Sequence, residues 1–146
     1  MPADKLLLEI TESAIMRDAA FAQRVLRDLK RRGVCLAIDD FGTGYSSLAH
    51  LKRLPVDELK IDKSFVLHLN EQATDDLVIV RSTIELGHNM GLVVIAEGVE
   101  TAESWSILKR LGCDMAQGYY MSPPLTAETF AEWIATSRFA AERRPR

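Results

Sequence analysis

The sequence contains no long uninterrupted apolar stretch. Its apolar runs, such as residues 6–8 and 92–96, fall far short of the ~20 residues that a membrane-spanning helix requires. The first residues also lack the apolar core of a secretory leader. We therefore expect a cytoplasmic protein that neither crosses a membrane nor is exported.

Cysteine is scarce. The 2 cysteines, Cys35 and Cys113, form no Cys-x-x-Cys pair, and no histidine stands at metal-ligand spacing. This argues against a zinc site or a disulfide framework. Because both cysteines lie inside or beside expected strands, we interpret them as small buried hydrophobic residues in a reducing compartment.

Positive charge is not in excess either. The 146 residues carry 18 Lys and Arg against 21 Asp and Glu, a net charge of -3. No general attraction to DNA, RNA or an anionic membrane is therefore expected. One basic cluster on a predicted helix is more simply explained as a solvated face than as a phosphate-binding patch. Its members are Arg24, Arg27, Lys30, Arg31 and Arg32.

Strand-like and helix-like patterns alternate along the chain, whose length and 47% hydrophobic content suit one domain with a sizeable core. Strands are expected at 5–10, at the start of 34–47, and at 58–62, 92–96 and 114–116. Helices are expected at about 21–32, 46–54, 74–88, 102–111 and 126–137. The alternation predicts an α/β fold with a parallel sheet in residues 1–137, followed by a polar tail, 138–146.

The periodicity also predicts which helix faces are buried. In the first helix Phe21, Val25 and Leu29 recur every fourth residue, with Ala22 and Leu26 alongside. We expect this face to cover the sheet.

The last helix should turn Phe130 and Ile134 inward in the same way. Two sheet architectures fit the pattern. One is an open doubly wound sheet of five strands, and the other is part of a (β/α)8 barrel, since five strands are too few to close a barrel. A receiver-like phosphoacceptor domain is a third hypothesis. It is weakened because such a domain has its acidic pair after the first strand and its lysine after the last.

Polar residues stand where successive strands end. The carboxyl ends of parallel strands build the functional sites of α/β proteins, so these residues are the candidate site. Neighbouring strand residues point to opposite faces, so the adjacent Asp39 and Asp40 can share a ligand only if the strand has begun to turn. Gly42 and Gly44 would permit that turn. The strand-end residues are Glu9, Asp39, Asp40, Lys60, Glu97 and Gln117.

Four carboxylates in one place need neutralising cations, and all-oxygen ligand sets suit Mg²⁺, Mn²⁺ or Ca²⁺. Two such ions bridged by a shared aspartate are a usual device for attacking a phosphodiester. Taken singly, each residue has a simpler explanation, such as a helix cap, a snorkelling lysine or a tight turn. The recurrence at successive strand ends favours the functional interpretation.

Five motifs resemble, in order and spacing, those of the EAL-domain cyclic di-GMP phosphodiesterases. The similarity covers residues 3 to about 136. It implies the C-terminal five or so βα units of a modified (β/α)8 barrel. The motifs are Leu8-Glu9-Ile10-Thr11-Glu12-Ser13, Asp39-Asp40-Phe41-Gly42-Thr43-Gly44-Tyr45-Ser46-Ser47, Leu59-Lys60-Ile61-Asp62, Ala96-Glu97-Gly98-Val99-Glu100-Thr101 and Gln117-Gly118-Tyr119-Tyr120.

The resemblance implies a role for each matched residue. Glu9 would bind a first Mg²⁺ or Mn²⁺ ion, Asp40 a second, and Asp39 would bridge the two. Lys60 would hold the hydrolytic water, and Glu97 would orient that water or complete the second metal site.

Two further residues match. Gln117 corresponds to a residue at the substrate and water site. Glu12 corresponds to the glutamate that steadies the glycine-rich loop after Asp40, a loop that in the family links metal occupancy to dimerisation. The Glu-Ala-Leu motif itself and an asparagine ligand are absent, so we expect a partial EAL domain that begins partway through the barrel.

The leading functional hypothesis is hydrolysis of cyclic di-GMP to the linear dinucleotide pGpG in bacterial signalling. The alternative is a catalytically inactive fragment that binds nucleotide or serves as a dimerisation module. The resemblance also implies a homodimer or other self-association, and upstream GGDEF or sensory domains in a longer parent protein.

Overall fold

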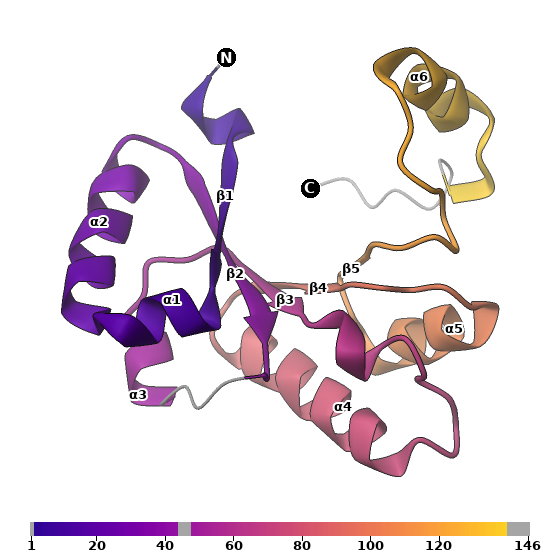
Figure 1. Ribbon diagram of the computed structural model, residues 1–146, viewed down its shortest axis with the longest axis horizontal. Coiled ribbons are helices and arrows are strands. Elements are labelled where there is room, and N and C mark those ends of the chain that lie inside the picture. Colours follow the sequence, from indigo (N-terminus) through magenta and orange to yellow (C-terminus); the bar gives the residue numbers. More distant parts are fainter. Residues whose placement is uncertain (1, 44–47, 140–146) are drawn as a thin grey trace.

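The computed structural model of the protein describes residues 2–43 and 48–139 (Figure 1). At its centre is a sheet of five strands, all paired in parallel. The alternating sequence pattern predicted this arrangement. The strands are β1 (Leu7–Thr11), β2 (Cys35–Phe41), β3 (Glu58–Ile61), β4 (Val93–Ala96) and β5 (Met115–Ala116).

Strands that neighbour one another in the sheet also follow one another in the sequence, in the order β1-β2-β3-β4-β5. A doubly wound sheet instead reverses its strand order at a switch point. Sequential order is that of a (β/α)8 barrel. The open doubly wound sheet and the receiver-like domain are therefore excluded, and the chain forms part of a barrel-type sheet.

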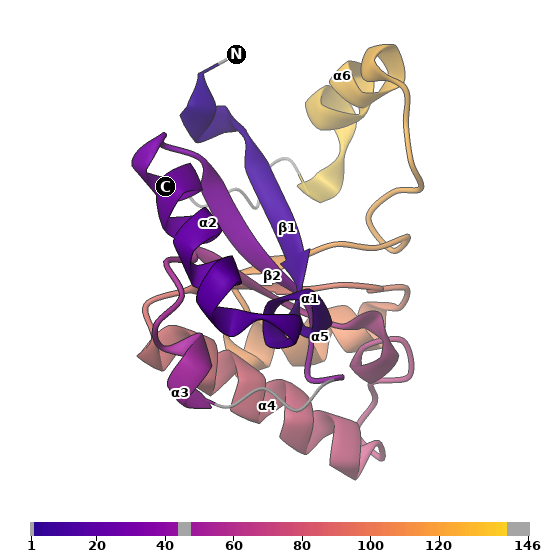
Figure 2. The same cartoon turned by 60° about the vertical axis from the view of Figure 1, so that its left-hand side comes forward.

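Helices follow the strands. In both views α6 stands apart from the other helices, whereas α4 and α5 run beside the sheet (Figures 1 and 2). No helix within the described residues is both long and apolar enough to cross a bilayer. The helices are α1 (Glu12–Arg17), α2 (Ala19–Arg31), α3 (Leu48–Leu51), α4 (Thr74–Asn89), α5 (Ala102–Leu111) and α6 (Ala127–Thr136), with short 3-10 helices η1 (Ala3–Lys5) and η2 (Lys63–Phe65).

The sequence pattern missed α1, η1 and η2. Each is too short to show a helical period, so only capping residues mark it. The Thr11 side chain accepts a hydrogen bond from the Ala14 amide at 3.3 Å, and the Asp62 side chain accepts one from the Ser64 amide at 2.9 Å. The predicted helix 46–54 is represented by α3, and its first residues lie outside the described part of the chain.

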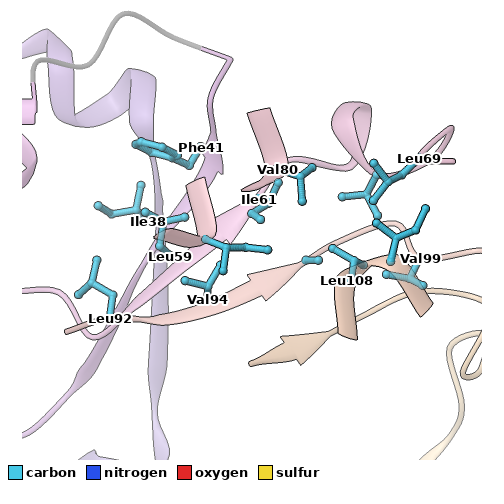
Figure 3. Packing of buried hydrophobic residues seen from close by; sticks show 14 of the residues in the cluster. Ile38, Phe41, Leu59, Ile61, Leu69, Val80, Leu92, Val94, Val99 and Leu108 are labelled. Atoms are coloured by element: carbon cyan, nitrogen blue, oxygen red, sulfur yellow. The ribbon is translucent and has the colours of Figure 1, made fainter. Parts of the chain in front are cut away.

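The main core lies between the sheet and α4 (Figure 3). Leu59 and Ile61 of β3 and Val94 of β4 are fully buried there. Val80 and Ile84 of α4 join the same cluster, as their periodicity predicted. Alternate residues of β3 point the other way, which leaves Lys60 on the opposite face of the sheet.

The buried face of α2 agrees with the prediction in part. Leu26 is buried against Val34 and Leu36, and Leu29 packs against the same cluster, as expected. Phe21 is 56% exposed and Val25 38% exposed, so the prediction is wrong for these two residues. The face that contacts β2 is therefore centred on Leu26 rather than on Val25.

The inward orientation predicted for α6 is also wrong for Phe130. This side chain is 48% exposed, and α6 has no buried residue. Phe130 instead stacks on Trp133 at a ring distance of 5.9 Å. Arg138 and Phe139, in the predicted tail, pack near Tyr120 at the end of the sheet.

The two cysteines are half-buried rather than fully buried. The Cys113 thiol donates hydrogen bonds to the carbonyl groups of Met115 and Val94 at 3.3 and 3.5 Å. Desolvation raises the pKa of Cys113 to about 12. Its thiol therefore stays neutral and acts as a small packing group, as its strand position suggested.

A substitution at Gly87 tests the packing of α4 on β4. A methyl group at this buried position would lie 2.3 Å from Cγ2 of Val94. We expect Gly87→Ala to lower the free energy of unfolding by about 1–3 kcal/mol through overpacking, although alanine favours helix. Urea unfolding followed by circular dichroism measures this change. Ser82→Ala, on the exposed side of α4, is the control and should shift stability by less than ~0.5 kcal/mol. Equal stability of the two variants would contradict the close contact.

Candidate active site at the carboxyl ends of the strands

A bulge in β2 brings two carboxylates to one place. Its pairing with β3 is irregular between Ile38 and Phe41, so Asp39 and Asp40 together oppose the single residue Lys60. Asp40 adopts a φ of 54°, in the left-handed region that aspartate tolerates better than most residues. Bulges of this kind redirect side chains at the rims of barrels.

The turn of the strand therefore begins earlier than predicted. We assigned it to Gly42 and Gly44, but the change of direction already occurs at Asp40. Gly42 follows with a φ of 102° and continues the turn. Gly44 lies outside the described residues.

The ammonium group of Lys60 is the centre of the site. Its Nζ lies 2.8 Å from Oε1 of Glu9, 3.2 Å from Oδ1 of Asp39 and 2.5 Å from Oε1 of Glu97. These side chains come from β1, β2, β3 and the residue after β4. The structure thus brings together four of the residues that the sequence pattern singled out.

Lys60 is buried as well as charged, with 6% of its side chain exposed. Burial disfavours its charged form, but its close contacts with the carboxylates of Glu9, Glu97 and Asp39 outweigh this effect and raise the pKa of Lys60 above the ordinary value for lysine. Lys60 therefore keeps its proton across the physiological range. A buried cation of this kind holds its anionic neighbours in place.

The acidic side of the site is incompletely neutralised. Oδ1 of Asp39 is buried and accepts no hydrogen bond, because its approach to Lys60 is an ion pair without hydrogen-bond geometry. Desolvation, followed by repulsion from Asp39, raises the pKa of Asp40 above its ordinary value. The site thus has room for more positive charge than Lys60 provides.

These features fit a hard divalent cation. The donors are carboxylate oxygens, which Mg²⁺ and Mn²⁺ prefer, and the buried Oδ1 of Asp39, which accepts no hydrogen bond, could ligate a cation. In the described part of the chain, no three His, Cys, Asp or Glu side chains are already arranged as ligands. Glu9, Asp39 and Glu97 point toward Lys60 instead, so ligation requires some of them to exchange the ammonium group for the metal.

The two remaining candidate residues lie differently. Glu12 is 3% exposed, and its Oε2 accepts a hydrogen bond from the Gly42 amide at 3.1 Å. Gln117 follows β5 directly, and its backbone amide donates to the Ala96 carbonyl at 2.8 Å. Gln117 therefore stands at the same edge as the cluster, but its exposed side chain makes none of the described contacts with Lys60.

Sequence reasoning gave no role to Asp62, two residues after Lys60. Burial alone would raise the pKa of Asp62, but hydrogen bonds from the hydroxyl and amide groups of Ser64 lower it below its ordinary value. Asp62 also interacts with Asp40 and contributes to the raised pKa of that residue. Its place in the motif Leu59-Lys60-Ile61-Asp62 was the available signal.

Comparison with known proteins gives a consistent result. The model of the EAL domain family matches residues 1–124. The chain is 47% identical over 130 residues to MucR of Pseudomonas aeruginosa, a bifunctional diguanylate cyclase/cyclic di-GMP phosphodiesterase. The match covers 89% of this chain and 19% of MucR, so the chain spans about a fifth of that relative's length.

Solved structures agree with the sequence match. A complex of the MucR phosphodiesterase with c-di-GMP is similar with a TM-score of 0.85 and 46% identity, covering 89% of this chain and 52% of that one. A manganese and cy-diGMP complex of BlrP1 from Klebsiella pneumoniae has a TM-score of 0.75 at 36% identity, covering 85% and 31% of the two chains.

The raised pKa of Asp40 leads to a stability prediction. Asp40→Asn removes a charge that is repelled by Asp39, and asparagine tolerates the left-handed backbone conformation as well as aspartate does. The free energy of unfolding at pH ~7 should therefore rise. The rise should be only roughly 0.5 kcal/mol, because solvent screens the repulsion. The gain should shrink as the pH falls through the raised pKa, because the parent's Asp40 is then protonated. Urea unfolding at pH ~7 and ~4 measures both values.

The control is Asp28→Asn, which removes an exposed carboxylate paired with Arg31 at 2.9 Å. It should change stability little at either pH. A loss of stability in Asp40→Asn at neutral pH would mean that the Asp40 charge is compensated in the folded protein.

Proposed function

The chain belongs to the EAL domain family, and on this premise we propose that its strand-end cluster hydrolyses cyclic di-GMP to the linear dinucleotide pGpG. One observation carries the proposal: a buried ammonium group, Lys60, held by Glu9, Asp39 and Glu97. Such a group can hold a water molecule or a phosphate oxygen beside oxygen ligands for a cation. MucR, to which the chain is similar, is a cyclic di-GMP phosphodiesterase, and this supports the choice of substrate.

The proposed reaction breaks one phosphodiester bond. The oxygen of a water molecule forms a bond to phosphorus, and the bond from phosphorus to the ribose O3′ breaks. A proton from the water passes to O3′, which leaves a 5′-phosphate on the linear product. Lys60 would hold the attacking water through Nζ, and Glu97, 2.5 Å from Nζ, would orient that water and take its proton, from where a proton passes on to O3′.

Glu9, Asp39 and Asp40 would hold the metal, with Asp39 shared between two sites. Mg²⁺ or Mn²⁺ ions, when bound, would lower the pKa of water and offset the charge on the phosphate. The manganese complex of BlrP1 supports this metal class. Gln117 would contact the substrate, and Glu12 would hold the turn that follows Asp40 through the Gly42 amide.

A second candidate is an inactive EAL unit that binds nucleotide or dimerises. It is favoured by the lack of a preformed set of three ligands among the described residues. Self-association has a physical basis, because among residues 2–43 and 48–139 β1 pairs only with β2, which leaves its other edge for a further strand. We also propose a cytoplasmic location and, in a longer protein, further GGDEF or sensory domains. The bifunctional MucR is an example of a relative with both activities.

The catalytic proposal is tested in a hybrid enzyme, in which residues 1–124 of this chain replace the matching segment of MucR. The hybrid should convert cyclic di-GMP to pGpG with Mn²⁺, as measured by chromatography of the products. Asp39→Asn should lower the rate by several orders of magnitude, because the shared ligand positions both ions and in-line attack tolerates little misplacement.

The matched control in the hybrid is Glu85→Gln, since this exposed glutamate of α4 is not part of the cluster; it should leave turnover unchanged. Turnover by the Asp39→Asn hybrid within a few-fold of the unsubstituted hybrid would rule out the two-metal role of Asp39.

The 146-residue chain by itself distinguishes the two candidates. The chain lacks the Glu-Ala-Leu motif and the asparagine ligand that the family resemblance implies, whereas the hybrid regains them from MucR, so we expect turnover several orders of magnitude below that of the hybrid. Product assays with Mg²⁺ and Mn²⁺ measure turnover, and light scattering measures the expected self-association. Comparable rates for the chain and the hybrid would show that the ligands assigned above are not the ones this protein uses.

A further inference from the structure

The short helix η2 (Lys63–Phe65) lies between two parts of the site. It begins three residues after Lys60. On one side it contacts the turn after β2, which follows Asp40, and on the other the turn after β4, which contains Glu97. Nothing in the proposed chemistry uses η2, yet it touches both acidic segments around Lys60.

The contact with the first turn is made by the ring of Phe65. A methyl group at Gly42 would lie 2.9 Å from Cε2 of Phe65, so the ring rests directly on the Gly42 backbone. The amide of Gly42 is bound by Glu12 at 3.1 Å. Gly42, two residues after Asp40, is therefore held both by a hydrogen bond and by the Phe65 ring.

The contact with the second turn is made by Cβ and Cα of Lys63, the first residue of η2. A methyl group at Gly98 would lie 2.7 Å from Cβ and 3.3 Å from Cα of Lys63. Gly98 directly follows Glu97 and has a φ of 69°. The contact depends on the path of η2 and leaves the Lys63 ammonium group uninvolved.

The position of η2 itself is fixed by a capping hydrogen bond and by the core residues that follow it. The side chain of Asp62 caps it by accepting a hydrogen bond from the Ser64 amide at 2.9 Å. Just after it, Val66 and Leu69 are buried in the main core, with 0% and 2% of their surface exposed. A displacement of either turn must therefore strain η2 or move residues of the core.

We propose that η2 is a positioning element that sets the distance between the Asp39–Asp40 segment and Glu97. This inference rests on the proposed hydrolysis, in which Asp39 and Asp40 would hold the metal and Glu97 would orient the attacking water. Phe65 holds the first turn, and Cβ and Cα of Lys63 hold the second. A shift of either turn displaces η2 and, through it, the other turn. The Asp39–Asp40 segment and Glu97 are therefore expected to move together.

The test uses Phe65→Ala, with amide hydrogen exchange of the 146-residue chain measured by NMR. Phe65 packs against Gly42 and the main core, but its atoms are not among those that lie against Gly98. If η2 couples the turns, exchange should rise roughly tenfold or more at Gly42 and also at Glu97, whose amide donates to the Ile61 carbonyl at 3.2 Å. The Leu36 amide, bound to Asp57 at 2.9 Å, reports global opening and should not change.

Lys63→Ala is the matched control within η2. It removes the ammonium group but keeps the Cβ and Cα that touch Gly98, so exchange at both turns should stay at the parent level. Phe65→Leu, which keeps an apolar side chain toward the core, replaces Phe65→Ala if the alanine variant does not fold.

In the hybrid enzyme Phe65→Ala should lower kcat about 10- to 100-fold with little change in KM, because the substrate still binds while the carboxylates lose their spacing. A change at Gly42 alone, with Glu97 unaffected, would overturn the proposal. An inactive hybrid would count against the proposed hydrolysis, whereas the exchange measurement would still decide whether η2 couples the two turns.

Discussion

One buried ammonium group holds the carboxyl ends of four strands in a single arrangement. Lys60 has 6% of its side chain exposed and three carboxylates within 3.2 Å. Burying a charge is costly unless its partners are in place, so the position of each carboxylate depends on the others. The same dependence prepares the site for chemistry, because the group that fixes the acids is also the one that can hold water or phosphate.

The two ends of the sheet use similar ion pairs for different purposes. At the amino-terminal ends of the strands, Asp57 accepts the Leu36 amide and pairs with Lys30 at 2.5 Å. Asp114 likewise accepts the Val94 amide and lies 2.9 Å from His88. Each pair joins a strand to the end of a helix and stays half-exposed. Such contacts stabilise the fold, whereas the cluster at the other end is crowded and acidic, as expected where a barrel places its active site.

The acidic end shows the strain that accompanies a functional site. Asp40 adopts a left-handed backbone conformation, and desolvation together with its neighbours raises its pKa. Oδ1 of Asp39 has no hydrogen bond. A chain selected for stability alone would avoid all three features, and their joint occurrence at one bulge is typical of sites whose constraints come from a ligand.

The sequence by itself determined the class of fold and most members of the site. Alternating strand and helix patterns predict a parallel α/β sheet, and polar residues at strand ends need only the common direction of parallel strands to meet. The family motifs supplied roles for Glu9, Asp39, Lys60 and Glu97. These inferences depend on local periodicity and on spacing, which one sequence displays directly.

Tertiary structure alone decided the rest. Strand order depends on pairing between segments far apart in the chain, so the strand and helix pattern left a barrel-type sheet and a doubly wound one both open. The family motifs favoured the barrel, and the observed strand order confirms it. The buried stripe of α2 was chosen by contact with β2, and Phe130 stayed exposed because no neighbouring element covers it within the described residues. The bulge at Asp39 and Asp40 arises from the register between two strands. Register, contact and coverage are properties of pairs of segments, and no local pattern in either segment contains them.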